Sequence, residues 1–240
     1  MQALNQNRIM RLKIMFQPQT SLQTSNVLNH QIYGFINKIL GDNNKWHGQP
    51  NQVHSISTIQ GGVPDKNGIL QYPNGGHIFV SSPDDEFMMA VMRGVDFAGN
   101  DVTIGSMKLV ETERCSIEDF QPMDKFDIVR TICPLYIKNN DNRSILFKDP
   151  EFISLLTEKS RKKLLKFGLG EQTVNSLEFQ LFHPENAKVS TVTVHKQINI
   201  ASRVMLVVKG NKNARKTLYE MGLGKSTCFG FGAVTINRQK

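Results

Sequence analysis

Hydrophobic and polar positions alternate along some stretches of the chain and recur with a helical period in others. Residues 9–16 largely alternate, which predicts a strand. After a loop of Gln, Thr and Ser residues, Asn29 caps a helix whose apolar positions recur at spacings of three and four, and Gly41 ends it. Residues 53–59 and 77–81 are predicted as two further strands.

A second helix and a fourth strand complete this first pattern. Residues 82–85, Ser-Pro-Asp-Asp, have the form of a capping box with proline at the first helical position, and they open a helix that continues to Val95. Residues 102–110 form the next predicted strand. The order is therefore β-α-β-β-α-β, which is that of a ferredoxin-like fold built from split βαβ units.

The same order of elements recurs after a polar connector over residues 111–125. The further predicted elements are strands over 127–137, 176–182, 189–200, 204–208 and 233–237, and helices over 149–166 and 212–221. The sequence thus predicts an α+β protein with two tandem ferredoxin-like (RRM-like) folds, one in residues 1–120 and one in residues 121–240.

Composition limits the kinds of partner, compartment and cofactor to be expected for this protein. The net charge of +8 and the pI near 9.4 favour a polyanion such as nucleic acid. The three cysteines form no C-x-x-C pair and indicate reduced thiols in a cytoplasmic protein. The longest apolar run, residues 87–92, is too short to cross a membrane, and no secretory signal or membrane partner is expected. The histidines lack metal-ligand spacing, so neither a metal site nor another cofactor is expected.

Four glycines in two Gly-x-Gly pairs mark the stretch over residues 221–234. Glycine lets the backbone take positive φ and approach a ligand closely, and successive amides beside a lysine can hold a phosphate. An ATPase P-loop is rejected, because Tyr219 stands where that motif needs a glycine and the order here is helix, loop, strand. A glycine-rich turn with no ligand is the alternative interpretation.

The sequence Gly-Leu-Gly-Lys-Ser-Thr-Cys-Phe-Gly-Phe-Gly, residues 222–232, follows a Tyr-Glu-Met helix end. It resembles the C-terminal signature of the repeat-associated (RAMP) RNA-binding proteins of CRISPR systems, and among them the endoribonuclease that cuts repeats out of the precursor transcript. The helix that begins near Asn29, the histidine after it and the Ser-containing strand 54–58 are similar to the N-terminal half of that enzyme. The resemblance implies tandem ferredoxin-like folds and metal-independent cleavage within CRISPR repeat RNA.

The chemistry implied by the resemblance is attack of a ribose 2′-hydroxyl on the adjacent phosphorus, which leaves 2′,3′-cyclic phosphate and 5′-hydroxyl ends. The family places a catalytic histidine after the first helix, where His47 stands, and Lys45 could stabilise the phosphorane. A helix tyrosine joins the histidine in one branch. Asn37 occupies that register here, and Tyr33 lies one turn earlier. His54 is the second candidate histidine, with a core residue as its alternative role.

The predicted RNA-binding residues lie in the glycine-rich stretch, on the helix before it and on the second sheet. They are Gly222, Gly224, Lys225, Ser226, Thr227, Lys212, Arg215, Lys216 and Arg203. A run of basic residues on one helix face is typical of a solvated surface, with an RNA backbone as the alternative. Its members are Lys159, Lys162, Lys163 and Lys166.

A second hypothesis is a non-catalytic RAMP subunit that binds guide RNA within a CRISPR effector complex. Both hypotheses expect an RNA partner, and only the enzyme predicts cleavage that a 2′-deoxy nucleotide at the cut prevents. Other effector subunits and a second copy of the chain are further candidate partners. A general single-strand RNA binder of RRM type is disfavoured, because no strand has the aromatic RNP1 pattern.

Overall fold

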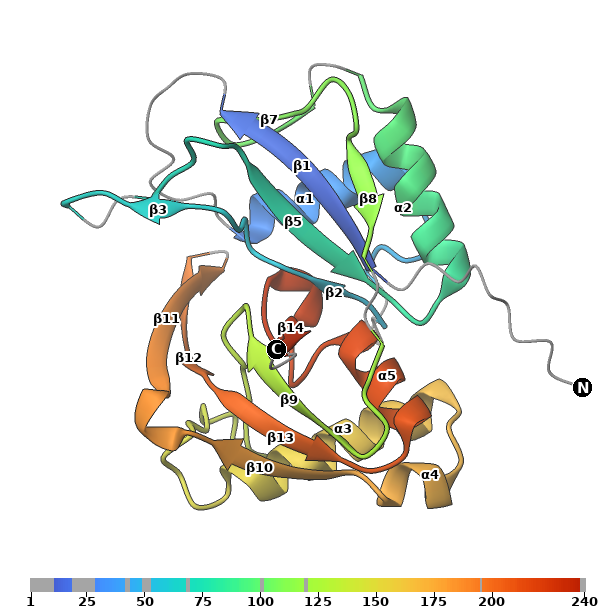
Figure 1. Cartoon of the computed structure of the whole chain (residues 1–240), viewed down its shortest axis with the longest axis vertical. Helices are drawn as coiled ribbons and strands as arrows, with labels where there is room; N and C mark the ends of the chain where they lie inside the picture. Colours follow the sequence, from blue (N-terminus) through green and yellow to red (C-terminus); the bar gives the residue numbers. More distant parts are fainter. Residues whose placement is uncertain are drawn as a thin grey trace, which may run out of the picture.

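The computed structural model describes residues 11–18, 29–41, 44–48, 53–67, 70–99, 102–118, 121–194 and 196–237. Each half of the chain forms its own antiparallel sheet with helices packed against it. The first half lies above the second in the view of Figure 1. Among the described residues, no helix has the length and apolar character needed to cross a membrane.

The first half contains a sheet in the order β2-β5-β1-β7-β6, to which β8 adds by pairing with β1. Its helices are α1 (Asn29–Leu40) and α2 (Asp85–Phe97). Its strands are β1 (Arg11–Pro18), β2 (Ser55–Ile56), β3 (Val63–Pro64), β4 (Leu70–Gln71), β5 (Gly76–Ser81), β6 (Thr103–Ile104), β7 (Met107–Leu109) and β8 (Cys115–Ile117).

The second half contains a four-stranded sheet in the order β10-β13-β9-β14 and a separate hairpin of β11 and β12. Its strands are β9 (Phe126–Thr131), β10 (Glu178–Phe182), β11 (Lys188–Val194), β12 (Gln197–Arg203), β13 (Met205–Lys209) and β14 (Val234–Ile236). Its helices are α3 (Phe152–Phe167), α4 (Glu171–Asn175), α5 (Lys212–Met221) and the short 3₁₀ helices η1 (Pro184–Asn186) and η2 (Thr227–Phe229).

Both sheets place the four strands of a β-α-β-β-α-β unit in the same spatial order. In the first half β2-β5-β1-β7, and in the second β10-β13-β9-β14, are the second, third, first and fourth strands of their units. The repeated order, together with the helices on each sheet, confirms the predicted α+β architecture of tandem ferredoxin-like folds.

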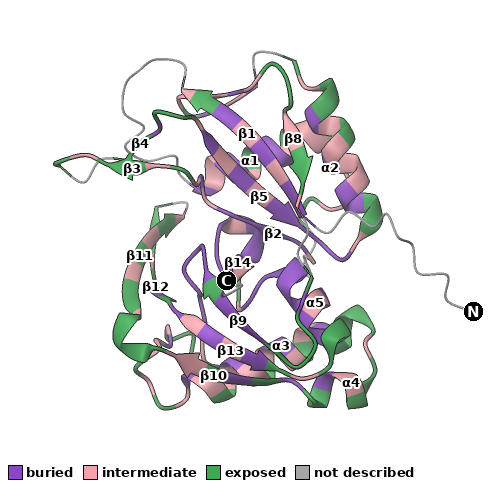
Figure 2. Cartoon of the chain, viewed as in Figure 1, coloured by how far each residue is buried: buried purple, intermediate pink, exposed green. Residues whose placement is uncertain are grey.

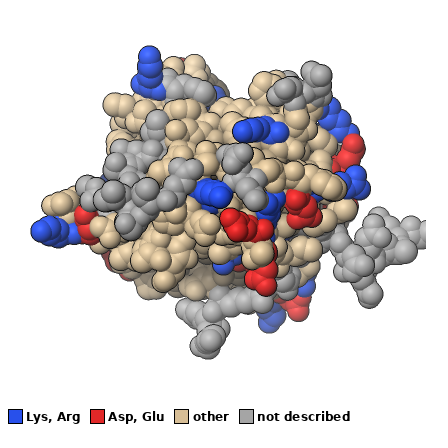
Figure 3. Space-filling model, turned by 90° about the horizontal axis from the view of Figure 1, so that it is seen from above, with Lys and Arg blue, Asp and Glu red and all other residues tan. Residues whose placement is uncertain are grey.

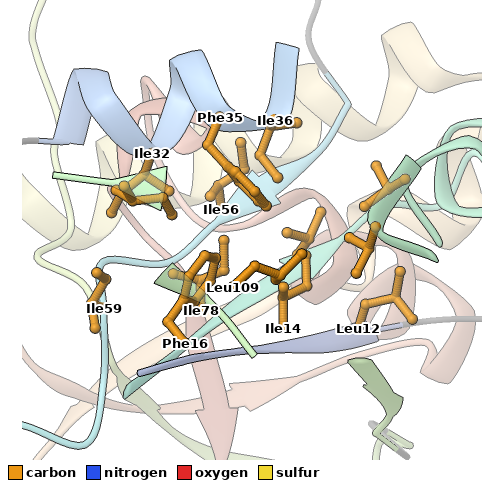
Figure 4. Close-up of a cluster of buried hydrophobic side chains, with 14 of the residues drawn as sticks. Leu12, Ile14, Phe16, Ile32, Phe35, Ile36, Ile56, Ile59, Ile78 and Leu109 are labelled. Carbon is orange, nitrogen blue, oxygen red and sulfur yellow. The ribbon is translucent and has the colours of Figure 1, made fainter. Parts of the chain in front are cut away.

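The core of the first half follows from alternation along β1. Ile14 pairs with Ile78 of β5, and every second residue of β1 faces α1, as Figure 4 shows. Phe16 meets Phe35 of α1 edge to face at 5.2 Å. Leu12, Ile14 and Phe16 are at most 1% exposed. Each such side chain contributes about 1.5–3 kcal/mol through burial, which fixes the register of β1.

The buried strand β2 lies between the two halves (Figure 2), and β2 and α1 both contact η2 of the second half. Arg11 of β1 is buried there and donates from Nη2 to the carbonyl of Val234 at 2.7 Å. The amide of Thr58 donates to the sulfur of Cys133 at 3.1 Å. Hydrogen bonds between the halves therefore fix their relative placement.

Several local predictions require correction. α2 begins at Asp85 with Asp84 as its N-cap, because the Asp84 carboxylate accepts from the amides of Glu86 and Phe87, and Ser82 lies before the cap. Two segments predicted as single strands contain a chain reversal. Residues 102–110 form the β6–β7 hairpin, which turns at Gly105, and residues 189–200 form most of the β11–β12 hairpin, which turns at Lys196. Both turn residues have positive φ.

Three further segments differ from the prediction. The stretch predicted as strand over residues 53–59 forms regular strand only at Ser55–Ile56, although the amide of Ser57 still donates to the carbonyl of Phe79. The loop that follows contains the β3–β4 hairpin, and the connector over residues 111–125 contributes β8. These short pairings depend on partners far away in the chain, so local alternation does not reveal them.

Two helical glycines offer a matched test of packing. A Cβ at Gly94 of α2 would overlap the carbonyl oxygen of Ile39, whereas a Cβ at Gly34 of α1 meets nothing within 4 Å. We expect Gly94→Ala to lower the free energy of unfolding by about 1–3 kcal/mol, because α2 must move away from α1. Gly34→Ala should raise it by up to about 1 kcal/mol. Urea unfolding of both variants measures the difference, and equal effects would contradict this account of the α1–α2 contact.

Candidate active site and nucleic-acid interface

The amphipathic helix α1 and the turn after it place two predicted catalytic side chains together. The apolar stripe of α1 faces the sheet, so Tyr33 lies half-buried at its edge. Gly41, with φ of 86°, reverses the chain into residues 44–48, where the amide of His47 donates to the carbonyl of Asn44 at 3.2 Å. The exposed His47 ring then stacks near Tyr33, with 6.2 Å between ring centroids and 27° between planes.

The glycine-rich segment reaches the same place from the other half of the chain. The ring of Phe229, in η2, lies 4.4 Å from the ring of Tyr33. Asn29, the first residue of α1, donates from Nδ2 to the Phe229 carbonyl at 2.8 Å. Tyr33 therefore contacts both the predicted catalytic histidine and the end of the predicted RNA-binding segment, although nearly 200 residues separate the two helices involved.

The glycines of this segment serve mainly close packing. A Cβ at Gly222 would lie 2.8 Å from Ser55 Oγ, and a Cβ at Gly230 would lie 2.9 Å from Asn29 Nδ2, both in the first half of the chain. Gly222 has φ of 73° and is buried, and Thr227 is 4% exposed. These two predicted RNA contacts thus face protein.

A smaller part of the segment remains open to a ligand. Gly224 and Ser226 are half-exposed, and Lys225 between them is exposed. The Lys225 amide donates to the Tyr136 carbonyl at 2.8 Å, but the amides of Gly224 and Ser226 have no acceptor among the described residues. Gly224 and Ser226 also have positive φ, of 74° and 59°. Such consecutive turns with free amides can bind an anion.

The basic residues of α5 divide into buried and exposed groups. Arg215 is 0% exposed, and its Nη1 lies 2.5 Å from the Asp127 carboxylate, so this predicted RNA contact is not accessible. Tyr219 donates to the same carboxylate at 2.8 Å, and burial raises the Tyr219 pKa well above its usual value. Lys212 is exposed but pairs with Asp124 at 2.8 Å, and Lys216 is half-exposed.

Lys45 is turned toward α2. Its amine lies 2.5 Å from the Glu86 carboxylate and 5.0 Å from the centre of the Trp46 ring. The Trp46 indole donates to Asp84 at 2.9 Å. The residue predicted to stabilise the phosphorane is thus engaged by the first turn of α2 in this structure.

His54, the second candidate histidine, is a core residue. It is 4% exposed and stacks on Phe87 with 4.5 Å between ring centroids and 13° between planes. Burial, followed by the nearby Lys163 ammonium, lowers its pKa to about 4. The His54 ring is therefore neutral at pH 7 and does not reach solvent.

A second feature lies where the second sheet meets the first half of the chain. A cavity of about 350 Å³ is lined by Arg130, Lys188 and the predicted Arg203, with Gln60 of the first half and His183. The Arg203 guanidinium donates to the Ile132 carbonyl at 3.1 Å. Sequence periodicity does not reveal this group, because its cations come from separate strands and meet only in the folded chain.

Positive charge is concentrated in the second half. Residues 121–240 carry 20 of the 29 Lys and Arg residues but 10 of the 21 Asp and Glu residues. On the end of the molecule formed by the first half, the visible cations are scattered among acidic residues on a mostly uncharged surface (Figure 3). A polyanion is therefore attracted chiefly to the second half. No group of three or more metal-binding side chains occurs within the described ranges.

Comparisons with known proteins show what the sequence and the fold are similar to. Residues 118–236 match the family model described as CRISPR associated protein Cas6, C-terminal. The chain is 24% identical over 189 residues to CRISPR-associated endoribonuclease Cas6 1 of Methanocaldococcus jannaschii, which covers 75% of this chain and 71% of that protein.

Solved structures are similar over almost the whole chain. A protein from a Cas6-related gene of Pyrococcus furiosus has a TM-score of 0.81 at 19% identity, covering 96% of this chain and 99% of that one. A structure described as an RAMP protein binding different RNA substrates has a TM-score of 0.76 at 18% identity, covering 95% and 100%. The predicted resemblance to the CRISPR repeat-processing RAMP proteins is confirmed.

Burial of His54 predicts an acid-dependent loss of stability. The folded pKa of about 4 lies below the unfolded value near 6.5, so the unfolded chain binds an extra proton between these pH values. Stability contributed by the neutral ring is present above pH 6.5 and is lost as pH falls toward 4, by up to about 3 kcal/mol. His77, whose pKa burial also lowers to about 4, adds to the same slope.

Replacing His54 by Phe should remove its share of the slope. The free energy of unfolding of His54→Phe should therefore improve relative to the original protein as pH falls from 7 to 4.5, as measured by urea titration at each pH. His183→Gln, at an exposed position paired with Glu185, is the control and should leave the slope unchanged. Parallel curves for His54→Phe and the original protein would rule out the buried neutral ring.

Proposed function

We propose that this chain, whose residues 118–236 match the Cas6 C-terminal family model, is an endoribonuclease that cleaves CRISPR repeat RNA. The observation that carries the proposal is the double contact of Tyr33 with His47 and Phe229. It brings an exposed imidazole to the same tyrosine as the end of the glycine-rich segment, whose free amides and lysine suit a phosphate. The activity named for the Methanocaldococcus relative supports the same class of reaction.

In the proposed reaction no metal takes part. The 2′-hydroxyl before the scissile bond loses its proton and attacks phosphorus, and the leaving 5′-oxygen gains a proton. The products are a 2′,3′-cyclic phosphate and a 5′-hydroxyl. The His47 imidazole performs one of the two proton transfers, a role worth about 10²–10⁴-fold. The hydroxyl of Tyr33 donates a hydrogen bond to the reacting phosphate.

The charge of the phosphorane needs nearby donors or cations. Lys225 and the amides of Gly224 and Ser226 fill this role in the proposal, because they are accessible and belong to the segment that ends at Phe229. Lys45 can take part only where RNA replaces Glu86 as the partner of its amine.

A longer RNA segment would extend beyond the cut site. We assign its backbone to the exposed cations of the second half, with Arg203, Arg130 and Lys188 around the 350 Å³ cavity as one group. Lys216 and Lys212 on α5 form a second group, for which Asp124 must release Lys212. Phosphates held by such side chains displace counterions, so binding weakens as salt rises.

The alternative proposal is a guide-RNA-binding RAMP subunit of a CRISPR effector complex that does not cut. It uses the same cations, and its partners are the other effector subunits. The engagement of Lys45 by Glu86 favours it, because the cation closest in sequence to His47 is then withheld from the phosphate. A pairing of two copies is compatible with either proposal and is measurable by light scattering.

Cleavage of candidate repeat RNA in EDTA, followed by analysis of the fragment ends, tests the enzyme directly. We expect 2′,3′-cyclic phosphate and 5′-hydroxyl ends, and no cutting when the nucleotide before the scissile bond is 2′-deoxy. His47→Ala should slow cleavage by about 10²–10⁴-fold while RNA affinity stays within a few-fold. Tyr33→Phe, which keeps the ring against Phe229, should slow it by about 10²-fold.

Two outcomes would count against this assignment. Normal turnover by His47→Ala would remove the imidazole from the mechanism. Tight, specific binding of repeat RNA by the original protein without any cleavage would favour the guide-RNA-binding subunit.

The RNA path is tested by the salt dependence of binding. Lys225→Ala and Arg203→Ala should each weaken repeat-RNA binding and reduce the slope of log affinity against log salt by about 0.7 to 1. Lys66→Ala, which removes an exposed cation from the β3–β4 turn of the first half, is the control and should change neither quantity. A slope unchanged in Arg203→Ala would exclude the cavity from the RNA path.

A further inference from the structure

Lys163 differs from the other lysines of α3 in the direction of its side chain. The sequence suggests that it shares a solvated face with Lys159, Lys162 and Lys166. The structure shows a partly buried residue whose amine donates to the carbonyls of Met221 at 2.8 Å and Gly222 at 3.0 Å. Among the described residues no carboxylate pairs with this amine. Lys162, one residue earlier, is exposed and pairs with Glu158.

The acceptors explain why a hydrogen-bond donor is kept at this position. The carbonyls of Met221 and Gly222 are at the C-terminal end of α5, where carbonyls lack partners within the helix and carry partial negative charge. Burial lowers the pKa of Lys163 to about 7 from its ordinary value of 10.5, because it penalises the charged form of the amine. An apolar side chain would fill the space but leave the helix end without its donor.

The same amine also connects the two halves of the chain. It lies 3.4 Å from the hydroxyl of Thr227, and that hydroxyl donates to the carbonyl of His54 at 2.8 Å. Beside this bond Gly222 packs directly against Ser55. One side chain of α3 therefore links the end of α5, the start of η2 and the residue before β2.

The segment that Lys163 holds continues into the candidate active site. Phe229, two residues beyond Thr227, closes η2 and contacts Tyr33, and Asn29 holds its carbonyl. A shift of the segment at Thr227 would move Phe229 relative to Tyr33 and, through that ring, the neighbourhood of His47. A misplacement of about 1 Å can slow a positioned reaction by about 10²-fold.

We propose that Lys163 is a positioning residue, which pins the glycine-rich segment to the first half of the chain and so keeps Phe229 on Tyr33. Its effect on RNA cleavage rests on the proposed function, whereas its effect on the segment does not. Lys163 touches neither the candidate catalytic side chains nor the exposed Lys225.

The test compares Lys163→Met with Lys162→Met, which removes one exposed cation from the next position of the same helix. Hydrogen exchange followed by mass spectrometry should show exchange in residues 222–231 that is about 10-fold faster or more in Lys163→Met, with the core of the first half unchanged. Lys162→Met should match the original protein.

The cleavage rate is a second measurement, and a residue that only stabilises the fold would leave it unchanged. With repeat RNA in single turnover at saturating protein, we expect Lys163→Met to cut on the order of 10- to 100-fold more slowly, while the dissociation constant changes less than about 3-fold. If no protein cuts the RNA, the proposed function fails, and the exchange data still decide the role of Lys163.

Three results would overturn the inference. One is unchanged exchange of residues 222–231 in folded Lys163→Met. Another is faster exchange throughout the protein with a normal cleavage rate. The third is weaker RNA binding with a lower salt slope and normal saturated cleavage, which would make Lys163 a phosphate contact. If Lys163→Met does not fold, Thr227→Val, which removes the bridging hydroxyl, replaces it, and unchanged exchange in that variant overturns the inference equally.

Discussion

The close approach of the backbone at Gly222 and Gly230 to side chains of the first half is the constraint on which the rest of the molecule depends. Any side chain at these positions would collide with Ser55 or Asn29 of the first half. Because both glycines also have positive φ, of 73° and 76°, an L-residue there would strain the backbone as well. Only this approach brings η2 against α1, and only then do parts from both ferredoxin-like folds share one site.

This constraint changes how the glycine-rich segment is understood. Glycines near a lysine suggest a phosphate cradle, yet Gly222, Gly230 and Gly232 are buried and serve contacts within the protein. Gly224 alone combines a half-exposed position with an amide that has no acceptor among the described residues. Packing accounts for Gly224 as well, since a Cβ there would lie 2.5 Å from the Tyr136 carbonyl oxygen. The proposed ligand contact therefore rests on the exposed amides and Lys225 at the centre of the motif, and not on its glycines as such.

Sequence reasoning worked where the determinants are local. The helix over 212–221 has the predicted limits, because Asn211 caps its start and a glycine ends it. At the level of sequence, Tyr33 and His47 are linked only through the family resemblance, which places Asn37 in the register of the helix tyrosine and Tyr33 one turn earlier. Arg215 and Lys163 could not be told from solvated cations, since what buries Arg215 is Asp127, 88 residues away, and what turns Lys163 inward is the end of another helix. The hairpin that reverses at Lys196 is predicted as one strand, because apolar and polar residues alternate on both sides of its turn.

The division of charge and chemistry between the halves explains why the junction must be rigid. The second half holds the excess of cations that attract a polyanion, whereas the first half holds His47 and has 11 acidic residues against 9 basic ones. A phosphate bound by one half meets the imidazole of the other only if the halves keep a fixed distance, and proton transfer needs donor and acceptor within about 3 Å. Hydrogen bonds from Asn29 to the Phe229 carbonyl and from Arg11 to the Val234 carbonyl hold the two halves at that fixed distance. If the chain cuts RNA as proposed, residues that never touch RNA then still affect how fast it is cut.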